Sequence, residues 1–203
     1  MYANFVGGIE MRKSREESAA TRQRIVESAS RRFRENGIAE TGLSDLMQAA
    51  GLETQGGFYK HFESKQQLLE ESLGYGFTEI LERLGATAEE AETEDRIEAI
   101  VSEYLSPKHR SCVAESCPLS AMGTELGRLE GDSREVAAEG LKELVALVAR
   151  QMKGKMTPAQ ARKRATAAVA AMVGGMMLSR IADNNQWSNS ILAETRKLVL
   201  QFS

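Results

Sequence analysis

Hydrophobic residues recur at helical spacing along most of the chain. From about Ala19 to Asn36, the side chains of Ile25, Ala29 and Phe33 follow one another at four-residue steps. Gly37 comes next and is a typical stop signal for a helix. The pattern predicts a first helix that buries one face and leaves an arginine-rich face in solvent.

Two short amphipathic segments follow this helix. The first runs from about Ser44 to Ala50 and is closed by Gly51, and the second begins at Thr54 or Gln55 and ends near His61. Two short helices separated by a glycine-containing turn predict a helix-turn-helix unit.

A longer helix is predicted after Ser64, whose hydroxyl can cap its first turn. Apolar residues recur at three- and four-residue steps from Leu68 to Leu84, so the helix is expected to end near Gly85. The acidic stretch from Ala86 to Glu98 predicts a loop or boundary.

Further helical patterns cover the rest of the chain, at about Arg96–Leu105, Pro118–Leu129, Ser133–Met152, Pro158–Ala182 and Ser190–Phe202. The sequence therefore predicts an all-α fold with a helix-turn-helix head and a larger C-terminal helical domain. The expected boundaries are a flexible N-terminal segment at 1–17, the head at 18–65 and the helical domain at 66–203.

Composition supports a folded helical protein. Hydrophobic residues make up 42% of the chain and charged residues 27%, which excludes disorder of the whole chain. Only 3 prolines and 5% aromatic residues favour helices over a β-sandwich. The net charge of −3 excludes a polycation that coats nucleic acid, so any nucleic-acid binding must be local.

Membrane and secretion signals are weak. The longest apolar run, Ala167–Leu178, is shorter than the roughly 20 residues that span a bilayer. Residues 1–9 lack the features of a secretory signal. We therefore expect a cytoplasmic protein without a membrane partner, in which Cys112 and Cys117 are reduced thiols.

Catalytic and metal-binding signals are also weak. The chain has two histidines, no HExxH or GxSxG motif, no Walker loop and no cysteine pair at zinc spacing. The sequence therefore predicts a protein that is not an enzyme and that binds no metal or cofactor.

Residues 22–73 closely resemble the DNA-binding head of the tetracycline-repressor (TetR) family of bacterial transcriptional regulators. The resemblance rests on Asn36-Gly37, Ala49-Ala50-Gly51-Leu52, Gly56-Gly57-Phe58-Tyr59-Lys60-His61-Phe62 and Leu68-Leu69. Farther along, Cys117-Pro118-Leu119 with Glu125-Leu126 is similar to a segment found in one subset of that family.

Candidate phosphate contacts lie on both sides of the second short helix. Thr41 and Ser44 place hydroxyl groups at the start of the first short helix, where they can face one phosphate strand. Tyr59, His61 and Lys65 resemble the family's phosphate-contacting aromatic and basic positions.

Candidate base contacts lie on or just before the same helix, which the resemblance makes the recognition helix. They are Thr54, Gln55, Gly56, Gly57 and Lys60. The glycines allow a close approach of the backbone, and Gln55 and Lys60 are expected to read base edges in the major groove.

For the C-terminal domain, the resemblance implies a small-molecule site and dimerisation through the last helices. Flexible methionines suit an adaptable cavity, although they are also common core residues. The candidate ligand-binding residues are Tyr104, Cys117, Met122, Met172 and Met176. The candidate interface residues are Val169, Met172, Ile191, Leu198 and Phe202.

The predicted function is a homodimeric regulator, most often a repressor in this family, that a small-molecule effector releases from a palindromic double-stranded operator. One alternative is a thiol- or electrophile-sensing regulator of the same fold that uses Cys117 and Cys112, because Cys117 precedes a predicted helix start that would lower its pKa. Less favoured alternatives are a helical cysteine enzyme with His109 as the base, and an interaction protein whose helix-turn-helix is vestigial.

Overall fold

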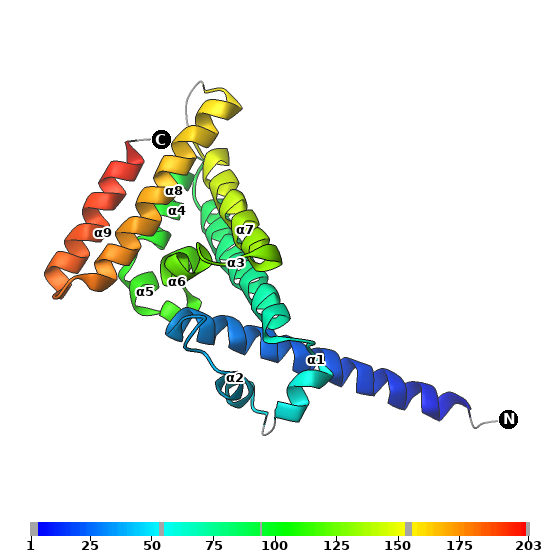
Figure 1. Ribbon diagram of the computed structural model, residues 1–203. Coiled ribbons are helices and arrows are strands. Elements are labelled where there is room, and N and C mark those ends of the chain that lie inside the picture. The colour runs from blue at the N-terminus through cyan, green and yellow to red at the C-terminus, as the bar shows by residue number, and fades with distance from the viewer. Residues whose placement is uncertain (1–3, 53–54, 94, 153–155, 202–203) are drawn as a thin grey trace.

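A computed structural model of the chain describes residues 4–52, 55–93, 95–152 and 156–201, and these ranges contain helices and no strand (Figure 1). The α-helices are α1 (Asn4–Asn36), α2 (Leu43–Ala49), α3 (Lys65–Glu90), α4 (Arg96–Tyr104), α5 (Pro107–Ser111), α6 (Pro118–Leu126), α7 (Gly131–Arg150), α8 (Pro158–Ile181) and α9 (Asn185–Leu200). Two short 3-10 helices are η1 (Gln55–Lys60) and η2 (Val113–Glu115).

The predicted all-α architecture is confirmed. Among the helices described, none is both long and apolar enough to cross a bilayer.

The helices surround two hydrophobic cores. The head core lies between α1, α2, η1, the first half of α3, part of α6 and the first turns of α7. Its buried residues are Ile25, Val26, Ala29, Phe33, Leu46, Met47, Phe58, Phe62, Leu68, Leu69, Leu73, Phe77, Met122, Leu126 and Ala137. The body core lies between the second half of α3 and the helices α4, α7, α8 and α9, and includes Ile80, Leu84, Tyr104, Leu144, Met172 and Val199. α3 therefore contributes residues to both cores. In Figure 1 it runs from α1 at one end of the molecule into the bundle beside α7.

The first helix is longer than the sequence pattern indicated. It was predicted from about Ala19, but α1 begins at Asn4, so residues expected to be flexible are helical from residue 4 onward. The N-terminal end of α1 projects from the bundle in Figure 1, where no neighbouring helix requires an apolar face. The C-terminal end agrees with the prediction, because Gly37 adopts a φ of 87° and its N–H donates to the Phe33 carbonyl at 2.9 Å.

Side-chain caps fix the starts of α9 and α3, and the end of α3 differs from the prediction. α9 begins at Asn185, five residues before the predicted Ser190, since the Asn184 side chain accepts from the N–H of Trp187 at 2.9 Å. The predicted cap at Ser64 is confirmed, with its hydroxyl accepting from Gln67 N–H at 3.1 Å. α3 continues beyond Gly85 to Glu90, so much of the predicted acidic loop is helix.

Candidate DNA-binding head and effector cavity

Buried aromatic rings fix the position of η1 in the head. Phe58 and Phe62 are buried and stack with ring centroids 5.6 Å apart. The Arg22 guanidinium lies 4.5 Å above the Phe62 ring, donates to the His61 carbonyl at 3.2 Å and pairs with Glu71 at 2.5 and 2.6 Å. Arg22 therefore joins α1, η1 and α3. This role could not be predicted from the sequence, because a run of arginines does not show which of them forms an ion pair with a distant carboxylate.

The candidate DNA contacts differ in exposure. Tyr59 is 66% exposed, Lys60 and Ser44 are exposed, and His61 and Gly57 are half-buried. Thr54 lies outside the described residues, as does the side chain of Gln55, although η1 begins at Gln55 and includes Gly56. The described part of this set thus presents an aromatic ring, a hydroxyl and a cation to solvent.

Two other candidates are bound to the turn between α1 and α2. The Thr41 side chain is fully buried, and its hydroxyl donates to the Gly37 carbonyl at 2.6 Å. The hydroxyl was expected to face a phosphate strand, but it stabilises the turn instead. Lys65 Nζ donates to the Ile38 carbonyl at 3.2 Å. Because an ammonium group has three donors, Lys65 retains donors for a phosphate.

α6 connects the head to the rest of the molecule. The Glu125 carboxylate accepts from the backbone N–H groups of Ile38 and Ala39 at 2.9 and 3.0 Å, immediately after α1 ends. Met122 and Leu126 of α6 are buried in the head core. The helix is kinked at Met122, whose φ of −141° and ψ of 29° are non-helical. Met122, a candidate ligand contact, therefore packs against the head.

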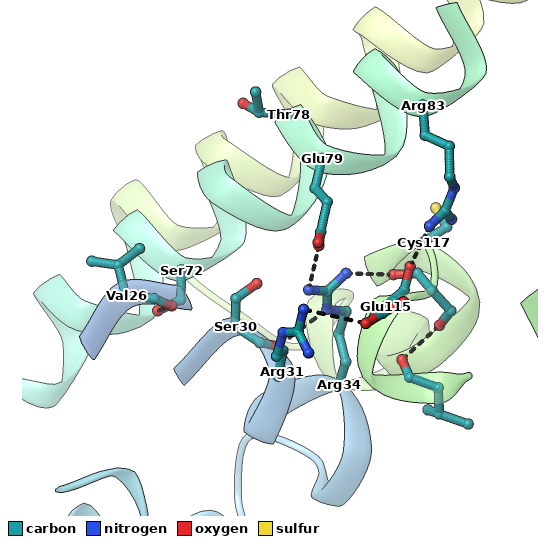
Figure 2. Close-up of polar contacts among 12 residues, drawn as sticks. Val26, Ser30, Arg31, Arg34, Ser72, Thr78, Glu79, Arg83, Glu115 and Cys117 are labelled. Carbon is teal, nitrogen blue, oxygen red and sulfur yellow. Dashed lines mark hydrogen bonds and ion pairs between the residues drawn. The ribbon is translucent and has the colours of Figure 1, made fainter. Parts of the chain in front are cut away.

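A second connection centres on Arg34 (Figure 2). Its guanidinium is fully buried, pairs with Glu79 of α3 at 2.7 Å and donates to the carbonyls of Ser116 and Ser30 at 2.9 and 3.1 Å. α1, α3 and α6 approach closely here, since a Cβ atom at Gly76 would lie 2.9 Å from the Ser30 hydroxyl and 3.2 Å from the Pro118 ring.

A cavity of about 630 Å³ lies between α6, α7 and α8. Its lining is mainly aliphatic, with two cations and two threonines, and consists of Leu119, Gly123, Thr124, Leu141, Lys142, Val145, Arg162, Thr166, Val169, Ala170, Val173 and Met177. A more polar cavity of about 510 Å³ lies between α3, α4 and α7 and is lined in part by Glu82, Glu89, Arg96 and Arg150.

The predicted ligand-binding residues do not line the apolar cavity. Tyr104, Cys117, Met172 and Met176 are buried in the body core, which means that the methionines fill space between helices. Val169 was predicted at the dimer interface but is 2% exposed and lines the cavity.

The surroundings of Cys117 disagree with the sensing and enzymatic alternatives. The thiol is fully buried, and this burial raises the pKa of Cys117, whereas a reactive thiol needs a lowered one. Only Cys112 is exposed. His109 Nδ1 lies 2.6 Å from the Tyr104 carbonyl and Nε2 accepts from the Cys117 backbone N–H at 3.0 Å. Both ring nitrogens are therefore engaged with the backbone, and His109 is not free to act as a base for the thiol.

The candidate interface residues are also separated by the structure. Leu198 is 47% exposed, Ile191 is half-buried, Met172 is fully buried and Phe202 lies outside the described residues. Three other large apolar side chains are more exposed than these candidates: Leu178, Ile181 and Trp187 at 57%, 75% and 56%. They surround the turn between α8 and α9.

Comparison with known proteins identifies both parts of the chain. Residues 25–72 match the family model "Bacterial regulatory proteins, tetR family", and residues 93–187 match "Transcriptional regulator LmrA/YxaF-like, C-terminal domain". The chain is 40% identical over 60 residues to the transcriptional regulator TtgR of Pseudomonas putida, a match covering 30% of this chain and only 28% of TtgR.

Two further similarities extend over most of the chain. An uncharacterised HTH-type transcriptional regulator of Mycobacterium tuberculosis is 25% identical over 189 residues, which is 88% of this chain and 94% of the relative. The crystal structure of a TetR transcriptional regulator from Chloroflexus aurantiacus superimposes with a TM-score of 0.77 at 25% identity and covers 92% of this chain and 96% of that one. The chain thus belongs to the TetR family of bacterial transcriptional regulators.

Proposed function

We propose that this protein is a ligand-responsive repressor that an effector in the apolar cavity releases from DNA. The observation that carries the proposal is the double role of α6. Leu119, Gly123 and Thr124 of this helix line the cavity, while Glu125 and Leu126 contact the head. A ligand that favours a different position of α6 would therefore also favour a different position of the head.

The head supplies the DNA-binding surface in this proposal. The segment from Gln55 to His61 enters a major groove, and the exposed side chains of Ser44, Tyr59 and Lys60 contact phosphates or base edges. η1 is firmly attached through Phe58, so it can dock as a rigid element.

A second copy of the chain covers α8 and α9 in this proposal. Leu178, Ile181, Trp187 and Leu198 expose apolar surface there, and clusters of exposed large apolar side chains commonly mark interfaces. A dimer would carry two heads, whose half-sites in comparable complexes lie about 34–36 Å apart or at multiples of that distance. Selection of bound sequences from randomised duplex should yield palindromes, and consistently asymmetric sites would contradict the dimeric mechanism.

Replacement of Lys65 by alanine should weaken binding to all DNA sequences to a similar degree. The loss of one phosphate contact should reduce the slope of log binding constant against log salt concentration by about 1. Titrations of the selected operator at several salt concentrations measure this slope. Lys163→Ala on α8 is the matched control and should leave the slope unchanged, whereas an unchanged slope for Lys65→Ala would place Lys65 outside the interface.

Replacement of Glu125 by alanine should loosen the connection between α6 and the head. Hydrogen bonds to a charged group contribute about 1.5–3 kcal/mol, so the amide hydrogens of Ile38 and Ala39 should exchange with solvent at least about tenfold faster. Native-state hydrogen exchange measures both amides. Glu125→Gln keeps a carbonyl acceptor and should show a smaller increase. Equal exchange rates in the parent and Glu125→Ala would remove α6 as the connecting element.

A further inference from the structure

We propose that the cavity between α6, α7 and α8 binds an amphipathic organic anion, namely a single carboxylate on an unbranched aliphatic chain. The inference rests on the proposed effector-binding role and adds the chemical class of the effector. A volume of about 630 Å³ lies within the range of about 300–1,000 Å³ found for small-molecule sites.

The walls of the cavity suit an aliphatic body. Leu119 of α6, Val145 of α7 and three side chains of α8, Val169, Val173 and Met177, supply branched or flexible apolar surface. None of the described lining residues is aromatic, so the cavity offers no ring on which a planar ligand could stack. Burial of a flexible chain against such walls gains free energy with every methylene group.

The charges of the cavity select an anion. Lys142 of α7 and Arg162 of α8 both line the cavity, and the described lining contains no carboxylate. Lys142 pairs with Glu139 at 2.8 Å, but both side chains are about 60% exposed, and pairs of this kind are weak enough to exchange for a ligand. Arg162 has no ion-pair partner within the described residues, and a guanidinium can bind a carboxylate through two parallel hydrogen bonds.

The first test compares three ligands that share an unbranched ten-carbon skeleton, using the full chain without DNA. Calorimetry should show that decanoate binds at least about tenfold more tightly than decanol, and that decyltrimethylammonium binds more weakly still. From octanoate through nonanoate to decanoate, each added methylene should lower the Kd about fourfold. Equal affinity for decanoate and decanol, or a preference for the cation, would overturn the inference.

Variants then assign the binding to this cavity. Arg162→Gln should weaken decanoate about tenfold and leave decanol unchanged, while Lys163→Gln, on the same helix but outside the lining, should change neither. A Cβ atom at Gly123 meets open space, so Gly123→Phe should fill the cavity and abolish binding of both ligands. If thermal unfolding shows that Gly123→Phe folds poorly, Thr166→Trp is used in its place, because this substitution fills the cavity from α8. Full decanoate affinity in a folded, filled variant would place the site elsewhere.

Operator titrations with the same protein preparations separate this inference from the proposed function. If the chain binds a palindromic operator but no alkyl carboxylate, the anion inference fails while the DNA-binding proposal stands. If decanoate binds as expected and randomised duplex yields no bound sequence, the DNA-binding proposal fails while the ligand class stands.

Discussion

Replacement of Glu79 by alanine should lower the free energy of unfolding by about 3–5 kcal/mol, the range found when one partner of a buried ion pair is removed. The cost arises because Arg34 is fully buried and Glu79 is its ion-pair partner, at 2.7 Å. Without Glu79 the guanidinium charge would be balanced only by the carbonyl dipoles of Ser30 and Ser116. Urea denaturation monitored by circular dichroism measures the loss.

Two further variants test the cause of this loss. The pair Glu194–Lys197 on α9 is about two-thirds exposed on both sides, so Glu194→Ala should cost less than about 1 kcal/mol. Adding Arg34→Met to Glu79→Ala should recover part of the stability, because no charge then remains buried. A loss for Glu79→Ala no larger than that of Glu194→Ala would show that the buried pair does not stabilise the junction.

Acid should destabilise the protein through His109. Burial lowers the pKa of this imidazole to about 4 from 6.5; the bond to the Tyr104 carbonyl opposes the shift, and the positive charge of Arg83 adds to it. Because the folded pKa is the lower one, the unfolded chain binds more protons between pH 6.5 and pH 4. The contribution of His109 is therefore complete above pH 6.5 and decreases by about 3 kcal/mol as the pH falls to 4.

A neutral variant isolates this contribution from that of the carboxylates, which titrate in part of the same range. In His109→Gln the loss of stability between pH 7 and pH 4 should be smaller than in the parent, because no imidazole takes up a proton. Urea midpoints across this range measure both proteins. Parallel curves for the parent and the variant would mean that His109 does not titrate on unfolding.

The head could be predicted from sequence because its signals are local. The spacing of Ile25, Ala29 and Phe33, the stop at Gly37 and the cap at Ser64 each act within a few residues of their own position. The same locality explains the errors. The chain preceding Ala19 shows no apolar periodicity, yet it forms helix because periodicity reports packing against neighbours and not helix formation itself.

The connections between head and body could not be predicted, because their partners are far apart in sequence. Arg34 bonds to Ser116 and Ile38 to Glu125 across more than 80 residues. In the sequence, Glu125 belongs to a family-like segment, and its neighbours give no sign that its carboxylate binds the backbone N–H groups of residues far away in the chain. The lining of the cavity could not be predicted from the methionines either. Methionine is equally suited to a pocket wall and to a filled core, so its position in the sequence does not distinguish the two.

The shared course of α3 limits how far the two parts of this regulator are interchangeable. A head cut at residue 65, the predicted boundary, would leave behind Leu68, Leu73 and Phe77. A cut after Phe77 would still lack Met122 and Leu126, which reach the head core from α6. A chimera that gives this body a new operator specificity therefore requires matched substitutions on α6 as well as a junction within α3. In evolutionary terms, the DNA-reading surface can diverge freely, while the inner surface of the head must change together with the body.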